Sequence, residues 1–174
     1  MTALYVARDG VSFTDEAVSN GLGPVTRQEL TFGLFFFDCD LDGRLDLFAA
    51  NGHVFPQVDA LGRQETIYLQ RNSLFENTSD GCFRIPAGQG GPGFGVQTAS
   101  RGAAVGDVDG DGDLDLLVGN LDGPPTLLLN EGVGLGHFLY ARLVGTAPNT
   151  AAIGARVVAR VGEQKMLRLC GAQS

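Results

Sequence analysis

Two short acidic stretches determine the fold of this chain: DCDLDGRLD at residues 38–46 and DVDGDGDLD at residues 107–115. Aspartate stands at positions 1, 3, 5 and 9 of both stretches, and glycine stands at position 6. This pattern is typical of a tight turn, because glycine accepts the positive φ that such a turn needs. Each stretch continues through Leu-Asp-Leu into apolar residues, which predicts a β-strand directly after the turn.

The carboxylates of these turns need a partner of opposite charge. Two carboxylates about 5 Å apart repel by roughly 3 kcal/mol at an effective dielectric constant of about 20. A hard divalent cation removes that repulsion, and Ca²⁺ accepts roughly six to eight oxygen ligands in irregular geometry. The sequence therefore predicts two Ca²⁺ sites. Their candidate ligands are the carboxylates of Asp38, Asp40, Asp42, Asp46, Asp107, Asp109, Asp111 and Asp115, with the backbone carbonyls of Arg44 and Asp113 at position 7.

Other interpretations of the turns fit less well. An EF-hand needs Glu at position 12 and flanking helices, whereas Ala49 and Val118 stand there. A phosphatase of the haloacid dehalogenase type has a motif like residues 40–43, but Arg44 replaces the usual Thr or Val and alternating β/α segments are missing. A carboxylate-dependent hydrolase or phosphatase is kept as the alternative function, and a structural repeat module without metal as a third.

The charge distribution narrows the classes of partner. The 174 residues carry 20 acidic and 12 basic side chains, a formal net charge of −8. Without the eight aspartates at positions 1, 3, 5 and 9, 12 acidic residues face 12 basic ones, so the acidity is local. A nucleic-acid partner is not expected, because Lys165 is the one lysine and such proteins carry a basic surface. The apolar runs are too short for a membrane span.

The two turns lie in longer internal repeats. Gly33 matches Gly102 and Asn51 matches Asn120, at the same spacing of 69 residues that separates the aspartates. Repeats of roughly 40–70 residues made of short strands predict propeller blades. The expected fold class is therefore all-β: a partial propeller of about two to three blades, followed by a small β segment. Because a ring needs about four to eight blades, we expect the remaining blades in a longer chain.

The expected elements are short. Strands are expected at residues 4–6, 33–37, 45–49, 67–70, 73–76, 103–105, 114–118, 126–129, 137–144, 155–160 and 165–169, and a helical turn at 15–20. Residues 88–93 match GxGxxG, but no helix follows, so we expect a loop and not a dinucleotide site. The three cysteines form no CxxC pair and indicate neither a disulfide framework nor a zinc site, although one disulfide is an alternative in an exported protein.

Longer strings around the turns resemble the FG-GAP/VCBS repeats of integrin-type β-propellers. The nearest resemblance is to the cartilage acidic protein family, with its C-terminal ASPIC/UnbV segment. It is carried by FFDCDLDGRLDLFAANGHVFPQVD, SRGAAVGDVDGDGDLDLLVGNLDGPPTLLLNEG and HFLYARLVGTAPNTAAIGARVVARVG. The chain departs from that family at Thr150, where members often have Arg.

This resemblance implies a domain organisation and a function. FG-GAP/VCBS repeats, incomplete at the N-terminus, would occupy residues 1–136, and a truncated ASPIC/UnbV segment would occupy 137–174. The eight aspartates would be calcium ligands. The protein would be secreted, periplasmic or at the cell surface, and would serve in adhesion or binding of a protein or glycan without being an enzyme.

Overall fold

The structure is a computed structural model that describes residues 2–62, 66–132 and 136–171. The chain divides into two compact units, Met1–Leu135 and Gly136–Ser174. Short antiparallel strands dominate the described residues, and the helical segments are one or two turns long. The predicted all-β fold class is therefore confirmed. In the part of the chain that is described, none of the helices has the length and apolarity to cross a membrane.

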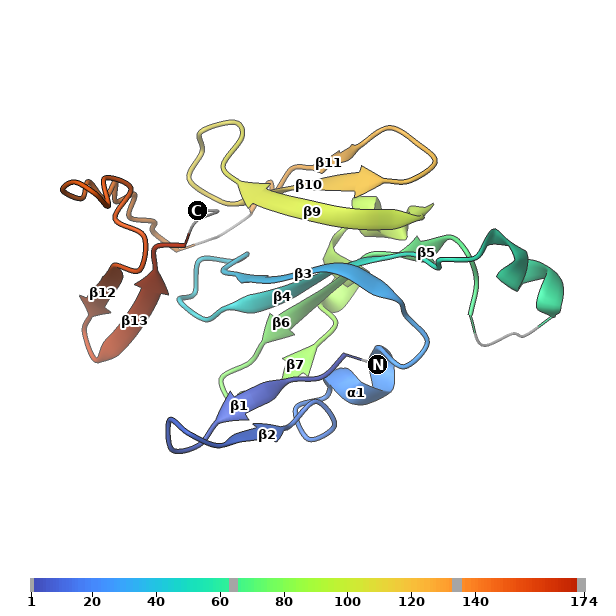
Figure 1. Cartoon of the computed structure of the whole chain (residues 1–174), viewed down its shortest axis with the longest axis horizontal. Coiled ribbons are helices and arrows are strands. Elements are labelled where there is room, and N and C mark those ends of the chain that lie inside the picture. The colour runs from blue at the N-terminus through green and yellow to red at the C-terminus, as the bar shows by residue number, and fades with distance from the viewer. Residues whose placement is uncertain (1, 63–65, 133–135, 172–174) are drawn as a thin grey trace. The chain divides into compact units, whose positions relative to one another are not determined.

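A four-stranded antiparallel sheet forms the centre of the first unit, in the order β3-β4-β6-β7 (Figure 1). Its strands are β3 (Thr31–Phe37), β4 (Asp46–Asn51), β6 (Ser73–Asn77) and β7 (Phe83–Arg84). Every residue of β4 is buried, whereas exposed and less exposed residues alternate along most of β3. A strand whose side chains are all buried must be covered on both faces of its sheet.

A three-stranded sheet in the order β11-β10-β9 covers one face of β4 (Figure 1). Its strands are β9 (Ser100–Gly106), β10 (Asp115–Asn120) and β11 (Thr126–Leu128). The side chains of Phe48 and Ala50 from β4 pack in one cluster with Leu116 and Val118 from β10. Burying a side chain as large as Phe48 contributes about 1.5–3 kcal/mol, so this cluster holds the two repeats together.

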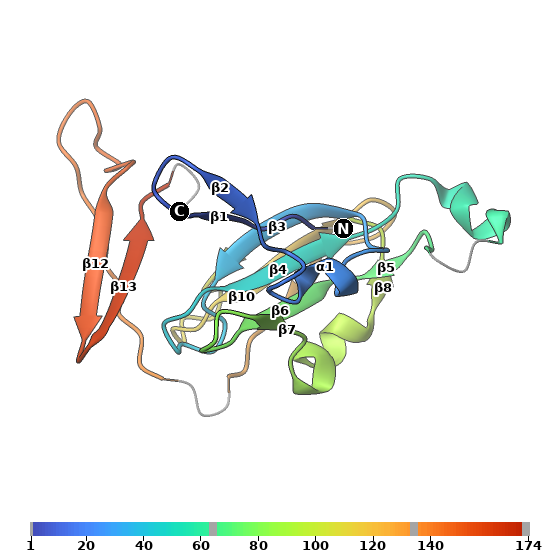
Figure 2. The same cartoon turned by 90° about the horizontal axis from the view of Figure 1, so that it is seen from below.

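The N-terminal segment covers the other face of β4 (Figure 2). It consists of the hairpin β1 (Tyr5–Ala7) and β2 (Phe13–Asp15), followed by α1 (Leu22–Val25). Leu22 packs with Leu47 and Phe75 in a second cluster. A helical turn is expected at residues 15–20, and there the Asn20 N–H donates a hydrogen bond to the Glu16 carbonyl (2.9 Å). The sequence does not predict α1.

Small elements fill the connections. They are η1 (Pro56–Leu61), β5 (Gln70–Arg71), η2 (Ala87–Gly90), η3 (Pro92–Gly95) and β8 (Gln97–Thr98). The strand predicted at residues 67–70 is mostly absent, because in this segment only Gln70 and Arg71 pair with another strand, β8. The GxGxxG match lies in η2 and η3, which are 3₁₀ turns and not the α-helix that a dinucleotide site needs.

The second unit contains one hairpin in its described residues, β12 (Arg156–Val161) with β13 (Gln164–Leu169). The strands predicted at 155–160 and 165–169 are confirmed. The strand predicted at 137–144 is wrong: those residues form no ladder and are mostly exposed. These residues are mostly apolar, which favours a strand, but a strand also needs a partner whose backbone N–H and C=O groups pair with its own.

Candidate metal centre

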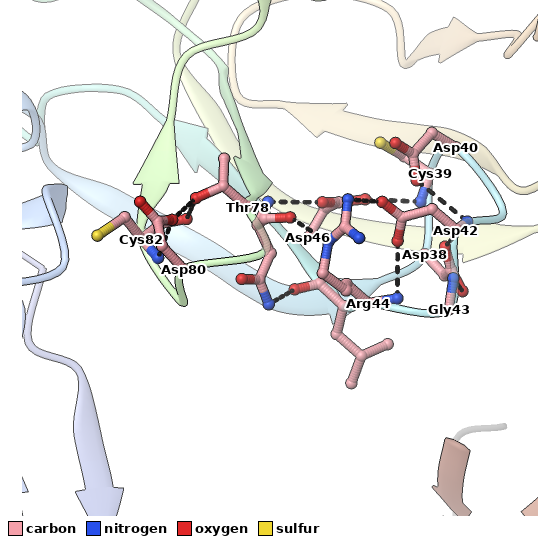
Figure 3. A network of polar contacts seen from close by, with 12 residues as sticks. Asp38, Cys39, Asp40, Asp42, Gly43, Arg44, Asp46, Thr78, Asp80 and Cys82 are labelled. Atoms are coloured by element: carbon pink, nitrogen blue, oxygen red, sulfur yellow. Dashed lines mark hydrogen bonds and ion pairs between the residues drawn. The ribbon is translucent and has the colours of Figure 1, made fainter. Parts of the chain in front are cut away.

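The first acidic loop joins β3 to β4 and folds its side chains inward. One carboxylate oxygen each from Asp38, Asp40 and Asp42 lies within 4.8 Å of the other two. The turn is held by Asp38, whose carboxylate accepts the N–H groups of Asp42 (3.1 Å) and Gly43 (3.1 Å). Gly43 has φ of 88°, which explains the glycine at position 6. Figure 3 shows the resulting cluster.

The second acidic loop joins β9 to β10 and repeats this turn. Asp107 accepts the N–H groups of Gly110 (2.7 Å) and Gly112 (3.2 Å). Here the converging carboxylates belong to Asp107, Asp109 and Asp115. The carboxylate of Asp111 lies outside that group and accepts the N–H of Asp113. Both predicted acidic clusters are thus brought together, each by three of its four candidate carboxylates.

The last aspartate of each loop has a second role that sequence reasoning missed. Asp46 and Asp115 are each only 1% exposed. Asp46 accepts the N–H groups of Cys39 (2.9 Å) and Asn77 (2.8 Å), so it ties the loop to the end of β6. Asp115 makes the same two contacts, with Val108 (2.8 Å) and Asn130 (2.9 Å). These carboxylates brace the hairpins, and only Asp115 also belongs to a converging group.

Position 7 differs between the loops. Arg44 forms an ion pair with Asp42, and its Nε donates to the Asn77 carbonyl at 2.6 Å. Asp113 is 4% exposed, and its Oδ2 accepts the Gly132 N–H at 3.3 Å. Its Oδ1 is buried and accepts no hydrogen bond from any described residue. The sequence assigned only a backbone carbonyl to both residues, whereas their side chains also lie at the loops.

The electrostatics of the loops favour a cation. Burial of the Asp40 carboxyl, and then the charges of Asp42 and Asp46, raise its pKa. Burial and then the charges of Asp40 and Asp46 raise the pKa of Glu76 on β6. Glu76 is an acidic neighbour that sequence reasoning missed, because no local pattern places β6 beside the loop. Each raised pKa means that the charged form is disfavoured, a cost that a bound cation offsets.

The end of each repeat opposite its acidic loop is fixed by an asparagine. Asn51 ends β4, is fully buried, and donates from Nδ2 to Ser73 Oγ at 3.1 Å. Asn120 ends β10 and donates from Nδ2 to Thr126 Oγ1 at 2.9 Å. The spacing of 69 residues noted in the sequence therefore reflects two copies of one strand–loop–strand unit, in which both ends are held by equivalent contacts.

A shallow hollow of about 250 Å³ lies elsewhere in the first unit. It is lined by Thr2, Ala3, Glu29, Thr31 and Leu34. None of these residues belongs to an acidic loop. The acidic loops are therefore separate from this hollow.

A family model supports the repeat assignment. The model of the FG-GAP-like repeat matches residues 38–118. The match begins at the first aspartate of the first loop and ends inside β10, so it contains both loops. Comparisons with curated proteins and with solved structures gave no match. Residues 38–118 are thus similar to an FG-GAP-like repeat, which agrees with the partial, all-β, propeller-like fold.

Proposed function

We propose that this chain is a calcium-binding β-propeller module that serves in binding and is not an enzyme. The observation that carries the proposal is the duplicated turn, in which three carboxylates converge within 4.8 Å in each loop. A single acidic turn is common on protein surfaces. Two copies with equivalent backbone contacts, at Asp38 and at Asp107, indicate a function that both turns share.

The residues fit a hard cation. All the converging groups are carboxylates, the ligand type that Ca²⁺ prefers. In the second loop, the buried Oδ1 of Asp113 has no donor among the described residues, and a nearby positive charge would offset the cost of burying it. Asp38, Asp40 and Asp42 would hold the ion in the first loop, and Asp107, Asp109 and Asp115 in the second. Bound calcium would supply positive charge that removes the repulsion within each turn.

A structural role of the metal follows from the position of the loops. Each loop connects the first two strands of a sheet, and its last aspartate is bonded to the backbone at the far end of the next hairpin. Several loop oxygens already accept backbone N–H groups, as in Asp38, so these side chains also shape the turn. This arrangement favours a binding scaffold over the hydrolase or phosphatase alternative.

The proposed location is outside the cytoplasm: secreted, periplasmic or at the cell surface. This location is inferred from the similarity of residues 38–118 to an FG-GAP-like repeat, and from the two carboxylate clusters that this segment carries. Within the FG-GAP group, we infer kinship with the cartilage acidic protein family, with residues 137–174 as its ASPIC/UnbV segment. The partners would be a protein or glycan, together with further blades of a longer chain.

Isothermal titration of the whole chain with CaCl₂, after removal of bound metal with EDTA, tests the calcium proposal. We expect saturable uptake and a rise in the melting temperature with calcium, because a ligand that binds only the folded state stabilises it. The matched control is the double variant Asp40→Asn/Asp109→Asn, which loses one converging carboxylate from each loop. Absence of calcium uptake at 5–10 mM, roughly tenfold above the weakest extracellular sites, would refute the proposal.

A further inference from the structure

We propose that the two acidic loops are unequal calcium sites. The loop at residues 107–115 binds tightly, and the loop at 38–46 binds weakly because Arg44 already neutralises one of its ligands. This inference rests on the proposed calcium function and adds a graded response to it. The reasons lie in position 7 of each loop and in which carboxylates converge.

Arg44 competes directly with a cation in the first loop. Its guanidinium forms an ion pair with Asp42, one of the three carboxylates that converge there (Figure 3). A second contact holds the guanidinium in place, because Nε donates to the Asn77 carbonyl at 2.6 Å. A divalent ion that uses the charged oxygen of Asp42 must therefore break or share an ion pair that the fold has positioned. That competition lowers the affinity of the first loop.

Asp113 has the opposite effect in the second loop. It occupies the position equivalent to Arg44, and its side chain is 4% exposed. Its Oδ1 has no hydrogen-bond donor among the described residues, so part of its negative charge is uncompensated. The first loop holds four aspartates and one arginine, a formal charge of −3, whereas the second holds five aspartates, a charge of −5. Ligand charge is one of the main determinants of calcium affinity.

The converging groups differ in the same direction. In the second loop one of the three carboxylates is Asp115, which two backbone N–H groups hold in place and which is 1% exposed. In the first loop the equivalent Asp46 lies outside the converging group, and the more accessible Asp42 takes part instead. A side chain that is already held in place loses less conformational entropy when it binds an ion. The second loop is therefore the more preorganised calcium site.

The consequence is a module with two calcium thresholds. The second loop would bind calcium at low calcium concentration, and the bound ion would hold the β9–β10 hairpin in place. The first loop would respond only at higher calcium, when the ion replaces Arg44 at Asp42. Because this exchange is between charged groups near the surface, higher ionic strength should weaken both the ion pair and the cation binding.

The experiment is calcium titration calorimetry on the whole chain, with variants that isolate each loop. Asp109→Asn leaves the first loop intact, and Asp40→Asn leaves the second intact. We expect Asp40→Asn to retain the tighter event and Asp109→Asn to retain the weaker one, with Kd values that differ by about tenfold or more. Far-UV circular dichroism in EDTA checks that each variant folds like the wild type.

Exchanging the charge at position 7 tests the cause. Arg44→Gln should tighten the first site at least about threefold, and Asp113→Asn should weaken the second by a similar factor. Equal affinities in the two loop-isolating variants, or a tighter first loop, would overturn the inference while leaving calcium binding intact. No uptake in the wild type would overturn the proposed function itself. If Arg44→Gln fails to fold, the comparison of Asp40→Asn with Asp109→Asn still decides the inequality.

Discussion

Replacement of Asp115 by asparagine separates its bracing role from metal binding. Asp115 accepts the Val108 N–H with one oxygen and the Asn130 N–H with the other, at 2.8 and 2.9 Å. An asparagine keeps one acceptor and turns an N–H group toward the other donor. The variant therefore loses one charge-assisted hydrogen bond, of about 1.5–3 kcal/mol, and leaves a buried donor unsatisfied, at about 1–3 kcal/mol.

Relief of repulsion offsets part of that cost. The carboxylates of Asp107 and Asp109 converge with Asp115, and removing one charge lowers their mutual repulsion. We therefore expect Asp115→Asn to lower the free energy of unfolding by about 2–4 kcal/mol without calcium. The matched control is Asp109→Asn in the same loop. Asp109 is exposed and accepts one long hydrogen bond of 3.3 Å, so its loss should cost less than about 0.5 kcal/mol.

The assay is urea unfolding of the whole chain in EDTA, followed by far-UV circular dichroism. Stability changes are taken from the midpoint at constant m value. With calcium added, Asp109→Asn should also become less stable than the wild type, because it loses ligand stabilisation, which reaches about 2.7 kcal/mol at 100 times Kd. The reasoning fails if Asp115→Asn matches the wild type in EDTA, or if both variants are equally destabilised there.

Three further predictions concern the backbone, the pH dependence and the opposite end of the repeats. Leu41 has φ of 56°, and the equivalent residue of the second loop, Gly110, has φ of 82°. Because glycine accepts a positive φ without strain, urea unfolding should show that Leu41→Gly raises the free energy of unfolding by about 0.5–1 kcal/mol and that Gly110→Leu lowers it by about 1–2 kcal/mol. Burial raises the pKa of the Glu29 carboxyl above 4.5, although hydrogen bonds from neighbouring side chains oppose this. The folded state thus binds that proton more tightly, so the contribution of Glu29 to stability is fully present below the unfolded pKa and is lost as pH rises through the folded pKa. In EDTA, Glu29→Gln should remove this part of the loss of stability above about pH 4.5. In the same assay, Asn51→Ala should lower the free energy of unfolding by about 2–4 kcal/mol and Asn120→Ala by about 1–2 kcal/mol, because Asn51 is fully buried and Asn120 is not. Equal losses of stability in the two variants would contradict this burial argument.

Local sequence was sufficient to predict the acidic turns and the main strands. The alternating aspartates and the glycine at position 6 constrain φ within a few residues, and the structure has Gly43 and Gly112 at positive φ, as that pattern requires. The repeat spacing of 69 residues also pairs Asn51 with Asn120, which make equivalent contacts in the structure. These features follow from short-range geometry, which a single sequence displays directly.

Contacts between distant residues decided the rest. Nothing near residues 137–144 indicates that they lack a partner strand, and nothing near β4 indicates that a second sheet covers it. The same holds for Asp46, whose acceptor role depends on Asn77, 31 residues further along the chain. Sequence therefore determined which groups bear charge and where the chain turns. Tertiary structure determined which carboxylates brace the backbone and what holds Arg44 beside Asp42, because Asn77 and Asn130 reach these loops only after the strands have paired.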